Sequence, residues 1–249
     1  MNKAQEEVQK HIRCRRGDVA KYVLLPGDPG RAKRIADQMD EAQLIAENRE
    51  YVVYTGTTAG VGVSVCSTGI GGPSASIALE ELANIGSDVF IRIGSAGGRQ
   101  KDIPIGTPVI ITASYRGEGT SKAYLPSEFP AVADWHVTGA LLAAAEQAEI
   151  DCRMGIGFTR DAYYVQDRPL NERLNSAGVV AAEQEASILF IVGPTRNVKV
   201  GAIVATDSNI WLDKQPTLRE KEEIFFTGEK KVISLALKAV QLMAEREAV

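Results

Sequence analysis

Apolar and polar residues alternate along this chain in blocks that predict strands and helices in turn. The most informative block spans residues 61–98. There two apolar runs, Val61–Cys66 and Asp88–Ile93, each end in glycines, and the leucine-rich stretch Ser74–Ile85 between them has helical character. This order is typical of a parallel α/β sheet, in which ligands bind at the carboxyl ends of the strands. Glycines at those ends let a ligand approach the backbone.

The same alternation continues on both sides of this block. The further predicted strands are Tyr22–Leu25, Tyr51–Thr57, Pro108–Ala113, Asp151–Thr159, Gly178–Ala182 and Lys199–Ala205. The further predicted helices are Ala32–Met39, Trp135–Ala148, Ala186–Val192 and Glu220–Arg246. We expect a polar lead-in over residues 1–17 and a hairpin formed by 51–57 and 61–66. We expect long connections at 114–134 and 161–170. Because no repeat or linker interrupts the pattern, we expect a single domain over 1–249.

Composition narrows the function. The 249 residues are 45% hydrophobic, which is enough for a large core, and the net charge of −4 argues against a nucleic-acid groove. No apolar run reaches the roughly 18 residues of a membrane span, and the polar N-terminus is unlike a signal peptide. Three cysteines without metal-ligand spacing favour a reduced, cytoplasmic protein. We therefore expect neither a nucleic-acid nor a membrane partner.

Polar residues gather where predicted strands end. They are Gly27 with Arg31, Gly69 with Gly71, Arg92 with Ser95, Glu183 with Glu185, and Asp207. If the strands are mostly parallel, these residues converge on one rim with a basic half and an acidic half. Arginine binds phosphate through charge-assisted hydrogen bonds, and carboxylates accept hydrogen bonds from a sugar diol. Arg92 lies inside an apolar run, so it must be paired or face a cavity.

Each of these features also has an ordinary structural explanation. The Gly27 turn and Arg31 are equally consistent with a common turn and a solvated arginine. Acidic residues such as Glu183 suit a helix N-terminus, and Asp207 can be a cap or turn residue. Two glutamates directly after a small apolar strand nevertheless favour a functional role.

With these residues in view, the chain resembles the nucleoside phosphorylase family that contains uridine phosphorylase and the hexameric purine nucleoside phosphorylases. The resemblance covers nearly the whole chain. It is strongest in Leu25-Pro26-Gly27-Asp28-Pro29, Cys66–Ser74, Glu80–Gly94 and Pro126–Asp134. It implies a three-layer α/β/α sandwich around a mixed, partly barrel-like sheet. It also implies reversible phosphorolysis of an N-glycosidic bond, with uridine phosphorylase as the nearer type.

The resemblance assigns residues to the phosphate and the ribose. Phosphate would be held by Gly27, Arg31, Arg92 and Ser95, and by Arg49 from a neighbouring subunit. Ribose hydroxyls would bind Glu185, and His11 of a neighbour would reach the 5′-hydroxyl. The family has a methionine between the two glutamates. Here that residue is Gln184, which bears on the sugar contact and on the choice between ribose and deoxyribose.

The resemblance also assigns residues to the base and to a cation. Gln166 and Arg168 match a pair that reads the uracil edge, and Tyr163 takes the place of an aromatic near the base. Glu183 is a further residue expected to bind the base. A monovalent cation such as K⁺ is implied at Glu50, Ile70 and Ser74. Asp207 stands where the purine enzymes of the family keep an acid.

The expected reaction passes through an oxocarbenium-like transition state that anionic phosphate stabilises and captures. Arg168 and Gln166 would neutralise a departing uracil, with Arg92 acting on phosphate, whereas a protonated Asp207 would serve a purine. We expect inorganic phosphate as co-substrate, no organic cofactor, and a homo-oligomer, a hexamer built as a trimer of dimers. The alternatives left open are a purine or dual-specificity phosphorylase, a nucleosidase and a non-enzymatic nucleoside-binding protein.

Overall fold

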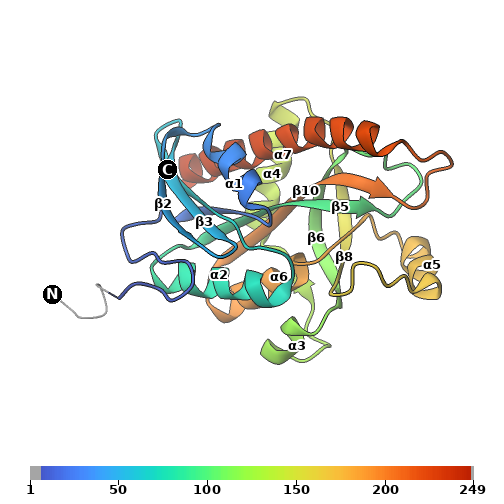
Figure 1. Ribbon diagram of the computed structural model, residues 1–249, viewed down its shortest axis with the longest axis horizontal. Helices are drawn as coiled ribbons and strands as arrows, with labels where there is room; N and C mark the ends of the chain where they lie inside the picture. Colours follow the sequence, from blue (N-terminus) through green and yellow to red (C-terminus); the bar gives the residue numbers. More distant parts are fainter. Residues whose placement is uncertain (1–6, 248–249) are drawn as a thin grey trace.

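One mixed β-sheet lies between two layers of helices in the computed structural model, which describes residues 7–247 (Figure 1). The strands are β1 (Tyr22–Pro26), β2 (Asp40–Asn48), β3 (Tyr51–Thr58), β4 (Val61–Cys66), β5 (Val89–Gly98), β6 (Pro108–Gly117), β7 (Ala131–Val132), β8 (Arg153–Arg160), β9 (Ala181–Glu183) and β10 (Lys199–Asn209). The helices are α1 (Pro29–Ala36), α2 (Gly72–Asn84), α3 (Thr120–Tyr124), α4 (Trp135–Gln147), α5 (Arg168–Ser176), α6 (Ala186–Thr195) and α7 (Leu218–Glu247). Helices α1, α4 and α7 cover one face, and α2, α3 and α6 cover the other (Figure 1). The expected three-layer α/β/α architecture is confirmed.

Helix starts follow from local sequence. Aspartates cap α1, α4 and α5. Asp28 accepts from the N–H groups of Gly30 and Arg31 at 3.0 and 2.8 Å. Asp134 accepts from the Val137 N–H, and Asp167 from the Leu170 N–H, each at 3.0 Å. A proline follows in the first turn of α1 and α5, where its missing N–H costs nothing.

The sheet topology brings several strand ends to one edge. Strands β4, β1, β5 and β10 are neighbours and parallel, so their carboxyl ends share an edge. Strand β6 is antiparallel to β10 and parallel to β8, and β9 links β8 to β5. Strands β5, β10, β6, β8 and β9 therefore close into a ring, which confirms the expected barrel-like part of a mixed sheet.

Alternation along the buried strands divides the core in two. On β1, Val23 and Leu25 pack with α2 and α6, whereas Tyr22 and Leu24 pack with α1, α4 and α7. The helix α6 is buried over its first eight residues and seals the first core. The sheet is thus held rigidly from both faces, and the loops at its edge rest on a fixed base.

Several predicted connections are wrong in detail. Residues 114–134 are not a long loop, because β6 continues to Gly117 and is followed by α3 and β7. Helix α5 begins inside the predicted 161–170 loop, and the predicted strand 178–182 is β9, which starts later and ends at Glu183. The strand β2 was missed because it is a mostly exposed edge strand without apolar alternation.

Other predictions are confirmed. The 51–57 and 61–66 runs form an antiparallel hairpin, and the long C-terminal helix extends over 218–247. The first six residues of the predicted lead-in lie outside the described part. None of the helices within residues 7–247 combines the length and apolar character that crossing a membrane requires.

Candidate active site

A buried ion cluster lies where β5 meets the start of α6. Arg92 on β5 is 3% exposed, and its Nε donates to Oε2 of Glu183 at 2.9 Å. Its Nη2 pairs with the carboxylate of Glu185. The two carboxylates outweigh the effect of burial and raise the pKa of the Arg92 guanidinium further. The prediction that this arginine must be paired is confirmed, and the convergence of the basic and acidic halves of the rim is confirmed at this point.

Glu183 connects the sheet to α6. Its Oε2 accepts from the backbone N–H groups of Glu185 and Ala186, each at 2.8 Å, and its Oε1 accepts from the Thr159 hydroxyl at 2.6 Å. Both oxygens are therefore engaged with protein groups, as expected of an acid at a helix N-terminus. Its contact with a base, implied by the resemblance, stays a prediction.

Glu185 lies between the cluster and a glycine loop. It is 4% exposed and accepts from the Gly71 N–H at 2.6 Å. Burial raises the pKa of this carboxyl, the charge of Glu183 adds to the effect, and Arg92 opposes it. Gly71 has φ 95°, a conformation that glycine adopts without strain. The side chain of Glu185 therefore joins β5, the loop after β4 and α6 at one point.

Arg31 approaches the same edge from α1. It is 6% exposed, its Nε lies 2.5 Å from Oε2 of Glu229 on α7, and its Nη1 donates to the carbonyl of Ile93 on β5 at 3.3 Å. Its guanidinium also lies 5.6 Å from the ring centre of Phe225. No sequence pattern pointed to Glu229, because it is one of several glutamates in a charged amphipathic helix.

The glycine turn before α1 packs against the loop after β4. The Gly69 N–H donates to the Gly27 carbonyl at 2.9 Å, and a Cβ on Gly27 would lie 3.1 Å from the Gly69 oxygen. The two loops are therefore so close that a side chain at position 27 would have to displace the Gly69 carbonyl by a few tenths of an ångström. The first N–H groups of α1 are occupied by Asp28, so the anion site predicted at this helix start has only the remaining backbone and side-chain donors. Ser95, further along β5, is half-buried beside β10.

Asp207 is the extra residue of a β-bulge. The β10–β5 pairing passes from Thr206 opposite Ala96 to Ser208 opposite Gly97, so Asp207 has no partner in the ladder. A bulge re-aims the side chain that it carries, and bulges are frequent beside active sites. The Ser208 hydroxyl donates to Oδ1 of Asp207 at 2.7 Å.

The predicted base-reading residues lie apart from the ion cluster. The Arg168 side chain is 87% exposed and pairs with Glu172 at 3.0 Å, and Tyr163 is 56% exposed. Gln166 accepts from Asn171 at 3.3 Å. The structure does not bring these side chains to Arg92. Gln184, in contrast, donates to the Asp161 carbonyl at 2.9 Å and ties the start of α6 to this loop.

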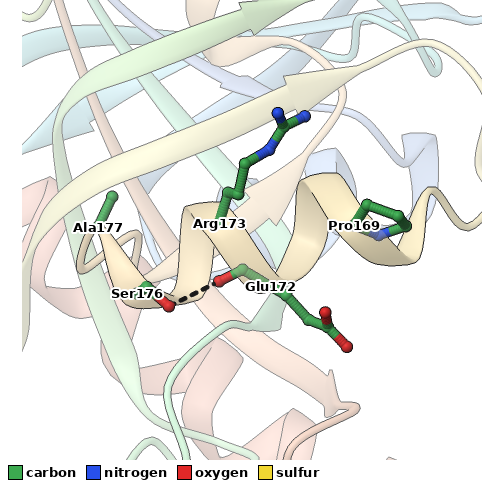
Figure 2. A pocket seen from close by; sticks show the side chains of 5 residues that line it. All are labelled: Pro169, Glu172, Arg173, Ser176 and Ala177. Carbon is green, nitrogen blue, oxygen red and sulfur yellow. Dashed lines mark hydrogen bonds between the residues drawn. The ribbon is translucent and has the colours of Figure 1, made fainter.

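A hollow along α5 contains none of the predicted site residues. It is lined by Pro169, Glu172, Arg173, Ser176 and Ala177 (Figure 2). The Ser176 hydroxyl turns back to the Glu172 carbonyl at 3.0 Å, a bond within the helix (Figure 2). The hollow is a surface feature of one helix, and no convergent polar groups mark it as a substrate site.

The two residues expected to serve a neighbouring subunit lie away from the cluster of their own chain. His11 holds Oε1 of Glu81 at 2.6 Å through its Nδ1, and Glu81 also accepts from the backbone N–H of His11 and Ile12. Arg49 is exposed at the turn between β2 and β3, with φ 56°. Both stay predictions, because a neighbouring subunit is needed to complete them.

The predicted cation residues are adjacent in space. A Cβ on Gly69 would lie 2.9 Å from Cγ of Glu50 and 3.4 Å from Oγ of Ser74, and Ile70 is 78% exposed. Ser74 already donates to the carbonyls of Ile70 and Gly71, each at 3.3 Å. No group of three or more His, Cys, Asp or Glu side chains suited to a metal ion occurs among residues 7–247. The cation site stays a prediction.

A buried chain of hydrogen bonds from Glu118 to Glu183 was missed. Glu118 is 2% exposed and accepts from the hydroxyls of Ser121 and Ser187, the latter at 3.0 Å. The Ser187 N–H donates to Thr159 at 3.0 Å, and Thr159 donates to Glu183. The only signal in the sequence was the position of Glu118 in a segment taken for a long loop, where functional residues are common.

Comparisons with known proteins identify the family. Residues 21–241 match the model of the phosphorylase superfamily. A uridine phosphorylase of Thermococcus kodakarensis is 43% identical, over 97% of this chain and 88% of its own length. A guanosine phosphorylase of Halorubrum lacusprofundi is 37% identical, over 87% of this chain and 90% of its own. The crystal structure of uridine phosphorylase from Vibrio fischeri superposes with a TM-score of 0.87 and 33% identity, covering 94% of this chain and 98% of that one. This chain belongs to the phosphorylase superfamily.

Proposed function

We propose that this chain is a uridine phosphorylase, converting uridine and phosphate to uracil and ribose 1-phosphate. The observation that carries the proposal is the buried contact of Arg92 with Glu185 at the carboxyl edge of the sheet. It puts a fixed cation next to a fixed carboxylate, which suits a substrate pair consisting of an anion and a sugar diol. The named relatives support the reaction class.

The cluster suits phosphorolysis in physical terms. Arg92 uses Nε and Nη2 on the glutamates, and its remaining N–H groups would serve phosphate oxygens, together with Arg31, Ser95 and the Gly27 backbone. Phosphate held beneath C1′ would stabilise the developing oxocarbenium ion and then attack it. Glu185 would accept from the ribose hydroxyls, and its fixed position would orient the sugar above the phosphate.

The assembly belongs to the same proposal. Arg49 and His11 would complete the site of a neighbouring subunit, which requires at least a dimer and is consistent with a hexamer of three dimers. A monovalent cation near Glu50 and Ser74 would lie close to the Gly69 loop.

A second function, purine phosphorolysis, is favoured by Asp207. Its position on a bulge of β10, just before the residues that pair with the β5 glycines, suits an acid that donates a proton to the leaving purine. The guanosine phosphorylase among the relatives also supports activity on purine nucleosides. We therefore expect measurable cleavage of inosine alongside better cleavage of uridine.

The test is base release from uridine and from inosine, each with and without phosphate. The proposal expects uracil and pentose 1-phosphate only when phosphate is present. Equal release without phosphate would indicate a nucleosidase, and binding without release would indicate a nucleoside-binding protein. Much faster cleavage of inosine than of uridine would reverse the order of the two candidate functions.

A further inference from the structure

Two arginines lie beneath the loop that carries the predicted base-reading residues. Arg99 follows the last residue of β5 and is 6% exposed, and its Nε has no hydrogen-bond partner within residues 7–247. Arg160 ends β8. Its Nη1 donates to the Val165 carbonyl at 2.9 Å, and its guanidinium lies 5.9 Å from the ring centre of Tyr163.

Buried Arg99 and half-buried Arg160 differ from the two buried arginines of the ion cluster and its edge. Arg31 and Arg92 are each paired with glutamate, whereas no carboxylate lies within 4.0 Å of Arg99 or Arg160 in the described part of the chain. Burial lowers the pKa of Arg99 to about 10, and the charge of Arg160 adds to the effect. Burial also lowers the pKa of Arg160. A buried cation beside a half-buried one, with no carboxylate at hand within residues 7–247, is unfavourable unless a ligand supplies the missing negative charge.

The position of the pair relates it to the ion cluster. Strand β9 lies between the two strands that carry the arginines, with Gly98 opposite Ala181 and Thr159 opposite Glu183. Arg160 contacts the loop between β8 and α5 directly, and Asn175 of α5 donates to the Arg99 backbone carbonyl at 2.6 Å. The two arginines therefore follow strands on either side of β9, which ends at Glu183, and Arg160 contacts the loop expected to hold the base.

The chemistry of the base supplies the missing charge. Uracil carries two carbonyl oxygens, and it becomes negatively charged as the glycosidic bond breaks. A guanidinium binds such oxygens through charge-assisted hydrogen bonds, and its contribution grows as the charge develops in a site shielded from water. Arg168, the expected base-reading arginine, is mostly exposed and paired with Glu172.

We propose that Arg99 and Arg160 bind the carbonyl oxygens of the pyrimidine base and take up the negative charge of the departing uracil. This inference rests on the proposed uridine phosphorylase function. Tyr163 would then hold the Arg160 guanidinium by a cation–π contact before substrate binds. When substrate binds, the same guanidinium would contact both the Tyr163 ring and the base.

The first experiment measures how the reaction depends on the leaving group. Arg160→Met and Arg99→Met are assayed with uridine and with 5-fluorouridine, whose electron-withdrawing fluorine stabilises the departing anion without the protein. We expect kcat/KM for uridine to fall about ten- to hundredfold, a smaller loss for 5-fluorouridine, and an unchanged KM for phosphate. Arg153→Met, an exposed arginine at the other end of β8, is the matched control and should leave all three values unchanged. Equal losses for both nucleosides, or none, would overturn the inference.

A second experiment separates this inference from the proposed function. Uracil alone is titrated calorimetrically into the wild type, Arg160→Met and Arg153→Met. About tenfold weaker binding to Arg160→Met than to the control supports the pair even if the wild type fails to cleave uridine, which would overturn only the proposed function. Uracil binding that does not change in Arg160→Met overturns the inference even if the wild type is a uridine phosphorylase.

Stability provides an independent readout for Arg99. Because its charge is buried without a partner, Arg99→Met should raise Tm while lowering activity, a trade-off typical of functional sites. An arginine that serves the fold would do the opposite. A lower Tm in Arg99→Met, or failure of that variant to fold, would therefore contradict its assignment.

Discussion

Arg31 on α1 and Glu229 on α7, 198 positions apart in the sequence, are joined by a contact of 2.5 Å between Nε and Oε2. Both side chains are buried, and Glu229 also holds Arg34 at 2.6 Å. The neighbouring Gly228 lets α7 pack closely on the turn at Gly106, because a Cβ there would lie 2.5 Å from the Gly106 oxygen. The C-terminal helix thus positions an arginine at the edge of the sheet where phosphate is proposed to bind.

Neutralising Glu229 should weaken both the fold and phosphate binding. Glu229→Gln leaves two arginines without their shared carboxylate, so we expect the free energy of unfolding to fall by about 3–5 kcal/mol. The KM for phosphate should rise, because Arg31 is no longer held in place. Urea unfolding at one fixed protein concentration and steady-state kinetics measure the two effects. Glu223→Gln, an exposed glutamate of the same helix paired with Arg219, should cost less than about 1 kcal/mol.

The same carboxylate predicts a dependence of stability on pH. Burial alone would raise the pKa of Glu229, but its hydrogen bonds from Arg34 and Arg31 outweigh burial and hold that pKa below its ordinary value. The resulting stabilisation is present above the unfolded pKa of about 4.3 and is lost as the pH falls through the folded value. As the pH falls below about 4.3, the free energy of unfolding of the wild type should therefore decrease faster than that of Glu229→Gln. Urea unfolding of both proteins across that pH range measures the difference. Parallel curves would assign acid unfolding to other groups.

Removing the Glu185 carboxylate should impair the sugar contact. Glu185→Ala loses the acceptor proposed for the ribose diol, and we expect a cost of about 2–4 kcal/mol in kcat/KM for uridine. The loss should be smaller for 2′-deoxyuridine, which lacks one of the two hydroxyls. Glu146→Ala, an exposed glutamate on α4, is the control. An unchanged efficiency with uridine would mean that Glu185 serves only Arg92 and the start of α6.

Mixing inactive variants tests the shared site. Chains carrying Arg49→Ala and chains carrying Arg92→Ala should regain part of the wild-type activity when mixed, because one site of a mixed dimer then has both arginines. A mixture of Glu185→Ala and Arg92→Ala is the control, since these residues belong to one chain's site, and it should stay inactive. A monomer with full activity by sedimentation would contradict the shared site.

The two candidate base-reading groups can be separated by substrate. Asp207→Asn keeps the shape of the side chain but cannot donate a proton, so it should suppress inosine cleavage and largely spare uridine. If the exposed loop closes over the base, Arg168→Ala should reduce uridine cleavage more than inosine cleavage. The loss in kcat/KM for uridine should correspond to roughly 1–3 kcal/mol, the cost of a lost hydrogen bond. Inosine cleavage that survives Asp207→Asn would remove Asp207 from the mechanism.

Local patterns predicted the architecture of this protein well. Apolar runs that end in glycine predicted β4 and β5, and the alternation of strands and helices predicted a layered α/β fold. The charge of Arg92 inside a buried run required a partner, since desolvation of an unpaired guanidinium is too costly, and two glutamates provide it. The edge strand β2 and the short helix α3 were missed, because neither has the apolar periodicity that burial imposes.

The partners of the charged groups depended on long-range packing. No periodicity relates Arg31 to Glu229, or Thr159 to Glu183, because side chains meet across the sheet only after distant elements dock. The bulge that frees Asp207 from the ladder likewise exists only in three dimensions, as does the lack of a carboxylate near Arg99 and Arg160 among residues 7–247. Residue type and spacing could therefore indicate which groups need a partner, but the geometry of the folded chain selects which partner each one finds.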